Sequence, residues 1–290
     1  MTSKKYYSLN DYLDMMNIDD IYTCDIHSYI NNPKYNFVYN KLFVSQSQNV
    51  PCAPLGIYPK TYPVIFKPIY NLHGMSRSFY KIHSDEEYDT CFKDGLFWQE
   101  YFPGPQVNLD VVYNKDQIVF YSALQSISGN QGSFKSHETL IDYIIPSKIE
   151  NWIHTYLKDY KGCLNIEIIS GNIIECHLRL NGDFHLYNPE FVGNLYEFFR
   201  GNIDTINYIV PYTCMFPLFI HRNLINSLKT NTEKFTKFLM KNPKVITFYY
   251  DKLDSIQQSH LLRAMMIEVN DYSHGEKIIE LFQKTLNELI

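Results

Sequence analysis

The stretch LNIEIISGNIIECHLRL, residues 164–180, decides the fold, because apolar and polar residues alternate on both sides of a Ser-Gly-Asn turn signal. This pattern predicts a β-hairpin. Successive strand residues point to opposite faces, so the polar residues of each strand share one face. They are Asn165 and Glu167 in the first strand, and Glu175, His177 and Arg179 in the second. We expect the tight turn to bring both polar rows onto the same side of the sheet.

Two interpretations of this polar surface stay open. Alternation alone favours an ordinary solvent-facing row on an antiparallel sheet. Glu167 and Glu175 would repel each other across the strands, however, unless a cation lay between them. Carboxylate oxygens suit Mg²⁺, and the guanidinium of Arg179 beyond them suits a phosphate or another anion. Zinc at His177 is disfavoured, because no cysteine shares its face and no second histidine lies at close spacing.

Short strands and helices surround the hairpin. Runs of β-branched and aromatic residues predict strands at 63–70, 79–83, 96–102, 107–127 and 245–251. Helical periodicity extends over 137–160, with an interruption near Pro146, and over 223–241 and 275–290. The apolar run 208–221 is interpreted as a core strand or helix. Because strands dominate the middle of the chain and helices flank it, the predicted class is α+β.

Composition excludes several classes of protein. The 290 residues carry 26 Lys plus Arg and 31 Asp plus Glu, a formal net charge of -5, so no broad basic footprint exists for coating a nucleic acid. No run approaches the roughly 18 apolar residues that cross a bilayer, and the N-terminus lacks the apolar core of a secretory signal. The 6 cysteines are scattered, which favours buried thiols over disulfides or zinc. We expect a cytoplasmic protein with neither membrane nor nucleic acid as a partner.

Walker A, G-x-G-x-x-G and G-x-S-x-G patterns do not occur, so P-loop, Rossmann and α/β-hydrolase sites are unsupported. Four other segments resemble, in order, the motifs of the ATP-grasp superfamily: NKLFVSQSQNVPCAP (40–54), PVIFKP (63–68), FWQEYFPGPQVNLDVV (97–112) and NIEIISGNIIECHLR (165–179). The resemblance implies an α+β ATP-grasp fold. Its expected parts are a shortened N-terminal region (1–62), a small lobe and hinge (63–128), and a large lobe with a C-terminal helical and β elaboration (129–290).

The same resemblance implies roles for individual residues. Lys41 and Lys67 would bind the nucleotide phosphates, and Gly74 and Ser76 would belong to the glycine-rich loop that covers them. The adenine would dock at the hinge of Gln99, Glu100 and Tyr101, and the ribose at Gln106. The Mg²⁺ ligands would be Glu167, Glu175 and His177. Arg179, together with Lys67, would act in catalysis by stabilising an acyl-phosphate.

The function that the resemblance implies is an ATP- and Mg²⁺-dependent ligase. It would join a carboxylate to an amine, or to a thiol, through an acyl-phosphate, and its substrates would be small molecules or peptides. Family members are often dimers, so a homodimer is among the expectations. The excess of Tyr and Phe, together with abundant Asn, Ile and Lys, is typical of AT-rich genomes and resembles proteins of large DNA viruses, which would place the protein in host cytoplasm or a virion.

Departures from the family pattern leave alternatives open. Gln99 and Gln106 are amides where the family has acids, and His177 replaces the family's Asn ligand. Lys41 and Lys67 are 26 positions apart, which is short for the family. These changes are compatible with a divergent enzyme and also with a non-catalytic relative that binds nucleotide or a partner. A phosphotransferase on the same fold is the third alternative.

Overall fold

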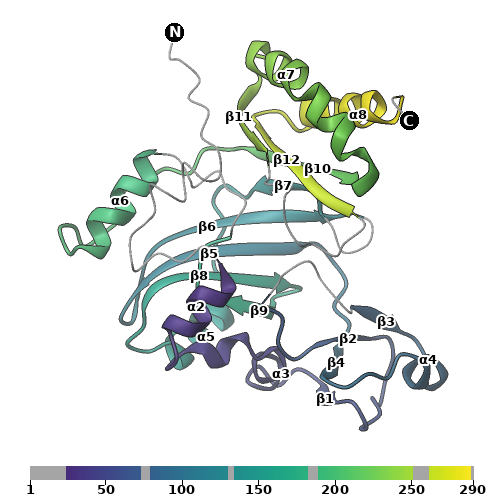
Figure 1. The fold of residues 1–290 in the computed structure, drawn as a ribbon. Coiled ribbons are helices and arrows are strands. Elements are labelled where there is room, and N and C mark those ends of the chain that lie inside the picture. Colours follow the sequence, from purple (N-terminus) through teal and green to yellow (C-terminus); the bar gives the residue numbers. More distant parts are fainter. Residues whose placement is uncertain (1–23, 73–78, 130–133, 182–188, 251–260, 289–290) are drawn as a thin grey trace.

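The computed structural model describes residues 24–72, 79–129, 134–181, 189–250 and 261–288. Two antiparallel sheets organise these residues (Figure 1). The smaller sheet has the strand order β1-β4-β2-β3, with bounds Cys52–Pro54, Leu96–Glu100, Val64–Pro68 and Tyr80–Ile82. The order in the larger sheet is β11-β12-β10-β7-β6-β5-β8-β9.

All strands of the larger sheet come from residue 106 onward. They thus include the second half of the segment predicted as the small lobe, 63–128, and the residues that follow it. Strands β5 to β9 are Gln106–Asn114, Gln117–Ser128, Phe134–Thr139, Lys161–Ile169 and Asn172–His177. Strands β10 to β12 are Cys214–His221, Val245–Tyr250 and Leu261–Val269. β5 and β6, which the sequence grouped with the small lobe, thus pair inside the larger sheet, and the chain passes from one sheet to the other after β4.

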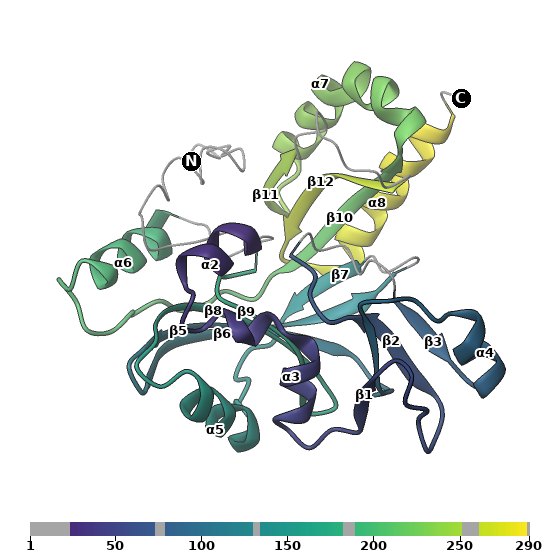
Figure 2. The ribbon, with the colours of Figure 1, turned by 60° about the horizontal axis from the view of Figure 1, so that its bottom comes forward.

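Helices pack on both sheets and at the place where they meet, and the helix Asp85–Thr90 belongs to the smaller sheet. They are α2 (Asp25–Asn31), α3 (Lys41–Gln46), α4 (Asp85–Thr90), α5 (Ser147–Tyr156), α6 (Pro189–Phe199), α7 (Ile225–Lys241) and α8 (Tyr272–Asn287), with the 3-10 turns η1 (Asn36–Tyr39) and η2 (Arg222–Leu224). α3 packs against β9 and also against β1 and β4, so it lies where the two sheets meet (Figure 2). None of the helices in the described part of the chain is long and apolar enough to span a bilayer.

Alternation gives the two faces of β5 and β8 different partners. Leu109, Val111, Leu164 and Ile166 are fully buried in one core with Trp152 and Ile153 of α5. On the opposite face, the part of β5 and β8 that lies next to β9 carries polar side chains. Farther along the same two strands, this face carries an apolar cluster that packs against α6. The polar half of this face is therefore the part of the sheet that is left for a site.

The C-terminal part of the chain has a separate hydrophobic core. α7 and α8 pack on β10, β12 and β11, and the rings of Phe235 and Phe282 stack with centroids 4.1 Å apart. Gly275 of α8 lies against the ring of Phe216 in β10, so the helix approaches the strand more closely than a side chain would permit.

One predicted helix is wrong in its first part. Residues 137–139 belong to β7, which pairs with β6 and β10, because the side chains of His137 and Thr139 are buried within the sheet rather than along a helix face. The helix begins after Pro146, at Ser147. The apolar run 208–221 forms strand β10 over Cys214–His221. The other predicted strands and the helices near 223–241 and 275–290 are confirmed within a few residues.

The free edge of β9 is covered by a side chain. The Nε2 of Gln48 donates to the carbonyl oxygen of Ile173 at 2.8 Å, and the backbone N–H of Ile173 donates to Oε1 of Gln48 at 2.8 Å. One amide side chain thus makes the pair of hydrogen bonds that a neighbouring strand would make.

Candidate active site

A β-bulge sets the geometry of the 164–180 hairpin. Ile169 pairs with Asn172 and Ile168 with Ile173, but Glu167 pairs with Glu175 and Asn165 with His177. Ile174 is therefore an extra residue in β9. In a regular hairpin with this turn, Glu167 would face Ile174, and Glu175 would point to the other side of the sheet. The bulge, and not the tight turn alone, brings the two polar rows onto one face.

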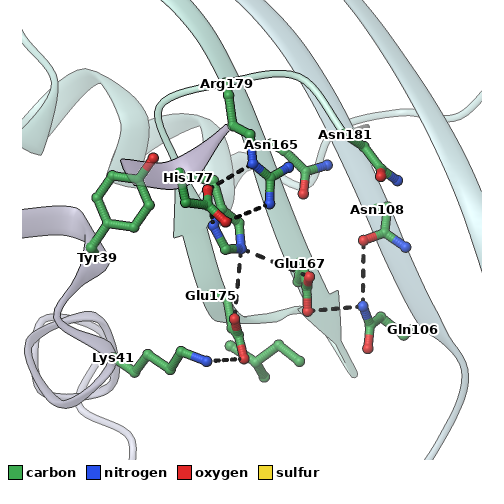
Figure 3. Close-up of polar contacts among 12 residues, drawn as sticks. Tyr39, Lys41, Gln106, Asn108, Asn165, Glu167, Glu175, His177, Arg179 and Asn181 are labelled. Atoms are coloured by element: carbon green, nitrogen blue, oxygen red, sulfur yellow. Dashed lines mark hydrogen bonds and ion pairs between the residues drawn. The ribbon is translucent and has the colours of Figure 1, made fainter. Parts of the chain in front are cut away.

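The three residues predicted as metal ligands converge on this face. Nε2 of His177 lies 3.6 Å from Oε2 of Glu175 and 3.8 Å from Oε1 of Glu167 (Figure 3). The three ligand atoms lie within 4.8 Å of one another. Nε2 is buried and, among the described residues, has no hydrogen-bond partner. Two carboxylates and an unpartnered imidazole nitrogen form a donor set that fits a divalent cation.

Two lysines reach this hairpin from outside the larger sheet. Nζ of Lys41 lies 2.5 Å from Oε1 of Glu175, and Nζ of Lys67 donates to the carbonyl oxygen of Ile174 at 2.9 Å. The bulge frees that carbonyl for Lys67. Burial lowers the pKa of Lys67 to about 8, although the charge of Glu175 opposes the shift. The structure thus brings both predicted phosphate lysines next to the predicted metal ligands.

Local structure explains how each lysine is positioned. Asn40 caps α3 by accepting a hydrogen bond from the backbone N–H of Phe43, which starts the helix at Lys41. Strand β2 pairs Lys67 with Phe97 of β4 and places its side chain in the interior, with 6 % exposure. Burial raises the pKa of Glu175, but Lys41, His177 and Lys67 lower it more strongly and hold it well below its usual range.

A residue that the sequence did not single out completes the cluster. Asp25, at the start of α2, receives two hydrogen bonds from Arg179, from Nε to Oδ1 at 2.6 Å and from Nη2 to Oδ2 at 2.9 Å. Its Oδ1 also lies 3.0 Å from Nδ1 of His177. Asp25 is 7 % exposed. Because 152 positions separate Asp25 from His177, no local sequence signal could have connected them.

In the absence of a cation, each carboxylate of the cluster has a positive partner: Lys41 for Glu175, Arg179 for Asp25 and the imidazolium of His177 for Glu167. Burial and the nearby Arg179 lower the pKa of His177, but Asp25 and Glu167 outweigh them and raise it to about 10. Burial raises the pKa of Asp25, yet His177 and Arg179 lower it well below its usual range. A metal ion between the carboxylates would take the place of the imidazolium proton, since a ligating histidine is neutral.

A chain of hydrogen bonds runs from the cluster across the sheet. Nε2 of Gln106 donates to Oε2 of Glu167 at 2.9 Å and to Oδ1 of Asn108 at 3.3 Å. Asn108 in turn bonds Ser126 at 2.5 Å, and Ser126 bonds Nδ1 of His137 at 2.7 Å. Gln106, predicted to bind ribose, therefore also orients Glu167 (Figure 3). Asn108 was missed because a polar residue inside the strand pattern carries no motif.

The residues of the predicted adenine hinge make hydrogen bonds to other groups of the protein. The side chain of Gln99 is buried and accepts a hydrogen bond from Oγ of Ser45 at 2.8 Å. The backbone N–H groups of Glu100 and Tyr101 donate to the carbonyl oxygens of Pro51 and Pro63 at 2.9 and 3.3 Å. Gly74 and Ser76, predicted to cover the phosphates, lie outside the described residues.

Comparisons with known proteins give a fold. No family model matches the chain, and no curated protein sequence matches it. Several solved structures, however, have a similar fold. The carboxyaminoimidazole ribonucleotide synthase of Aspergillus clavatus, complexed with ATP, has a TM-score of 0.59 at 13% identity, over 89% of this chain and 74% of that one. The L-amino acid ligase of Bacillus licheniformis has a TM-score of 0.56 at 10% identity, over 90% and 72%.

A third solved structure extends the likeness over almost the whole chain. The phosphoribosylglycinamide synthetase of Anaerococcus prevotii has a TM-score of 0.52 at 10% identity and covers 97% of this chain and 86% of that one. These likenesses confirm the predicted α+β class with the ATP-grasp fold. At 10–13% identity they establish the fold alone.

Proposed function

We propose that this chain is an ATP- and divalent-cation-dependent ligase that joins a carboxylate to an amine through an acyl-phosphate. The observation that carries the proposal is the convergence of Glu167, Glu175 and His177 with Lys41 and Lys67 where the two sheets meet. Carboxylates for a cation and lysines for phosphates are the groups that phosphoryl transfer requires. The solved structures that share the fold include an L-amino acid ligase, a carboxyaminoimidazole ribonucleotide synthase and a phosphoribosylglycinamide synthetase, which supports the same reaction class.

In this proposal each residue has a defined task. Glu167, Glu175 and His177 would hold the cation, which would neutralise charge on the transferred phosphoryl group. Lys41 and Lys67 bind the phosphates of ATP, and Lys67 releases the carbonyl of Ile174 to do so. Because Lys67 is 6 % exposed, its charge acts in a poorly solvated site where electrostatic stabilisation is strong.

The reaction divides into two transfers. The terminal phosphoryl group of ATP passes to a carboxylate oxygen of the acid, which gives ADP and an acyl-phosphate. The amine then attacks the acyl carbon, the bond from that carbon to the phosphate oxygen breaks, and inorganic phosphate leaves with the proton that the amine nitrogen gives up. Arg179 stabilises the negative charge of the departing phosphate. Since Nε and Nη2 of Arg179 bind Asp25 and Nη1 donates to the carbonyl of Leu180, an anionic substrate has to share or displace Asp25.

Trapping of the intermediate tests the proposal. The full chain is incubated with ATP, Mg²⁺ or Mn²⁺, a panel of amino acids and hydroxylamine, and both ADP and hydroxamate are measured. We expect both products, and we expect Glu175→Gln to reduce them at least about 100-fold, because the cation loses a charged ligand. Glu233→Gln is the matched control, since this carboxylate is 80% exposed on α7 and should leave the rate unchanged.

Two outcomes would contradict the ligase. Formation of ADP with the phosphoryl group retained on an organic hydroxyl would identify a phosphotransferase. Equal rates for wild type and Glu175→Gln would remove the metal cluster from the mechanism.

One observation favours a second candidate, a non-catalytic nucleotide-binding protein. The cluster neutralises itself, because Lys41 pairs with Glu175 and Asp25 pairs with Arg179. Such a protein would be stabilised thermally by ATP and a divalent cation, by about 2.7 kcal/mol at a ligand concentration 100 times the dissociation constant. It would form no ADP with any acid and amine of the panel.

A further inference from the structure

We propose that Asp25 is a positioning residue that holds His177 as a nitrogen ligand, and that the cluster therefore selects a first-row transition-metal dication such as Mn²⁺ over Mg²⁺. The inference rests on the proposed function, since it names the cation of the same site. It joins the N-terminal helix α2 to the chemistry of the larger sheet.

The first step is the orientation of the imidazole ring. Oδ1 of Asp25 is an acceptor that lies 3.0 Å from Nδ1 of His177, so Nδ1 carries the hydrogen and Nε2 faces Glu167 and Glu175. A carboxylate that binds the far nitrogen of a metal-ligating histidine fixes the ring and raises the basicity of the other nitrogen. Nε2 is the ring atom that no described group satisfies.

The second step is that Asp25 itself is fixed. Both of its carboxylate oxygens accept hydrogen bonds from Arg179. Ser28, one turn farther along α2, bonds the hydroxyl of Tyr39 at 2.5 Å, and that hydroxyl accepts from the backbone N–H of Leu178 at 3.1 Å. The ring of Tyr39 also packs edge-on to His177, with centroids 5.7 Å apart. Helix α2 is therefore tied to the end of β9 through His177 and the two residues that follow it.

The third step is the chemistry of the donor set. Mg²⁺ demands oxygen ligands and keeps several waters. Replacing one oxygen donor by an imidazole nitrogen raises affinity for first-row transition ions more than for Mg²⁺. Ligands at bond lengths of about 2.0–2.2 Å lie about 3.0–3.5 Å apart. The 3.6 and 3.8 Å from Nε2 of His177 to the two carboxylates are close to this spacing, and all three ligand atoms lie within 4.8 Å of one another.

Metal binding by the full chain tests this inference without relying on turnover. Mn²⁺ and Mg²⁺ are titrated calorimetrically, and bound Mn²⁺ is examined by electron spin echo envelope modulation, which detects a directly bound ¹⁴N nucleus. We expect nitrogen modulation in the wild type. His177→Asn, which restores an oxygen ligand, should abolish it and reduce the ratio of Mn²⁺ to Mg²⁺ affinity at least about 10-fold.

Asp25 is tested by a double-mutant cycle. Asp25→Ala should weaken Mn²⁺ binding about 10- to 100-fold in the wild type. In the His177→Asn background it should have little effect, because the nitrogen ligand that it positions is gone. Asp25→Asn keeps an acceptor for Nδ1 and should restore most of the Mn²⁺ affinity. If Asp25→Ala does not fold, the spin-echo result and His177→Asn decide the question.

The outcomes separate the two proposals. Binding of Mn²⁺ without nitrogen modulation, or an equal loss from Asp25→Ala in both backgrounds, overturns this inference and leaves the ligase standing. If neither Mn²⁺ nor Mg²⁺ binds, with or without ATP, both this inference and the ligase proposal are overturned.

Discussion

Glu268 gives the strongest quantitative prediction, because this carboxyl is buried in the C-terminal part of the sheet. It lies in β12 between Met215 of β10 and Thr247 of β11, with 7% exposure. Burial raises its pKa from 4.5 to about 7, although a hydrogen bond with Thr213 opposes the shift. Replacing the carboxyl by the amide of Glu268→Gln removes the titration and retains a polar group of similar size.

The sign and size of the effect follow from proton linkage. Below pH 4.5 the carboxyl is protonated in both the folded and the unfolded chain. Between pH 4.5 and 7 the unfolded chain loses the proton and the folded chain keeps it, so the free energy of unfolding falls as pH rises. Above pH 7 the loss levels off at about 3 kcal/mol, from about 1.36 kcal/mol per unit of pKa. From pH 5 to pH 7.5 the loss is about 2 kcal/mol.

Urea unfolding, followed by circular dichroism at pH 5.0, 6.0 and 7.5, measures this loss. The free energy of unfolding of Glu268→Gln, minus that of the wild type, should increase by about 2 kcal/mol from pH 5.0 to 7.5. Glu280→Gln, an exposed carboxyl on α8, is the matched control and should show a constant difference. A difference for Glu268→Gln that also stays constant with pH would refute the argument that burial controls this group.

Two further predictions concern packing and the sheet edge. Gly275→Ala should lower the free energy of unfolding by about 1–3 kcal/mol in urea titrations, because its Cβ would overlap the ring of Phe216; a stabilised variant would show that α8 can move away at no cost. Gln48→Ala should cost about 1–3 kcal/mol, because the N–H and C=O of Ile173 lose their partners, and the amide of Ile173 should exchange with deuterium faster. Unchanged exchange at Ile173 would indicate that solvent already reaches this edge.

Local pattern was sufficient for the hairpin but not for its register. Alternation placed the polar residues of each strand correctly, and the turn at Ser170 and Gly171 lies where the sequence predicted it, both residues having positive φ. Whether Glu167 and Glu175 share a face depends on the bulge at Ile174, and a β-branched residue in a strand gives no signal of a bulge. A two-residue turn between Ile169 and Asn172 would, without it, have separated them.

Contacts over long sequence distances account for what the sequence could not predict. Asp25 is one polar residue in the N-terminal region 1–62, and its role exists because α2 is held at the end of β9. The last three residues of β7, 137–139, were predicted as helical because the alternation there is brief, and the pairing of β7 with β10 joins residues 76 and 78 positions apart. The lysines were predicted through the family resemblance, whereas the contact of Lys67 with Ile174 again depends on the bulge.

The edge of β9 also bears on how the protein avoids aggregation. An exposed edge strand offers unpaired N–H and C=O groups to the strands of other molecules. Here Gln48 occupies both groups of Ile173, and Lys67 occupies the carbonyl of Ile174. If Lys67 leaves to bind phosphate, Gln48 remains, because it follows α3, which packs directly on β9. The protection of this edge against intermolecular pairing is therefore independent of whether Lys67 stays bound to Ile174.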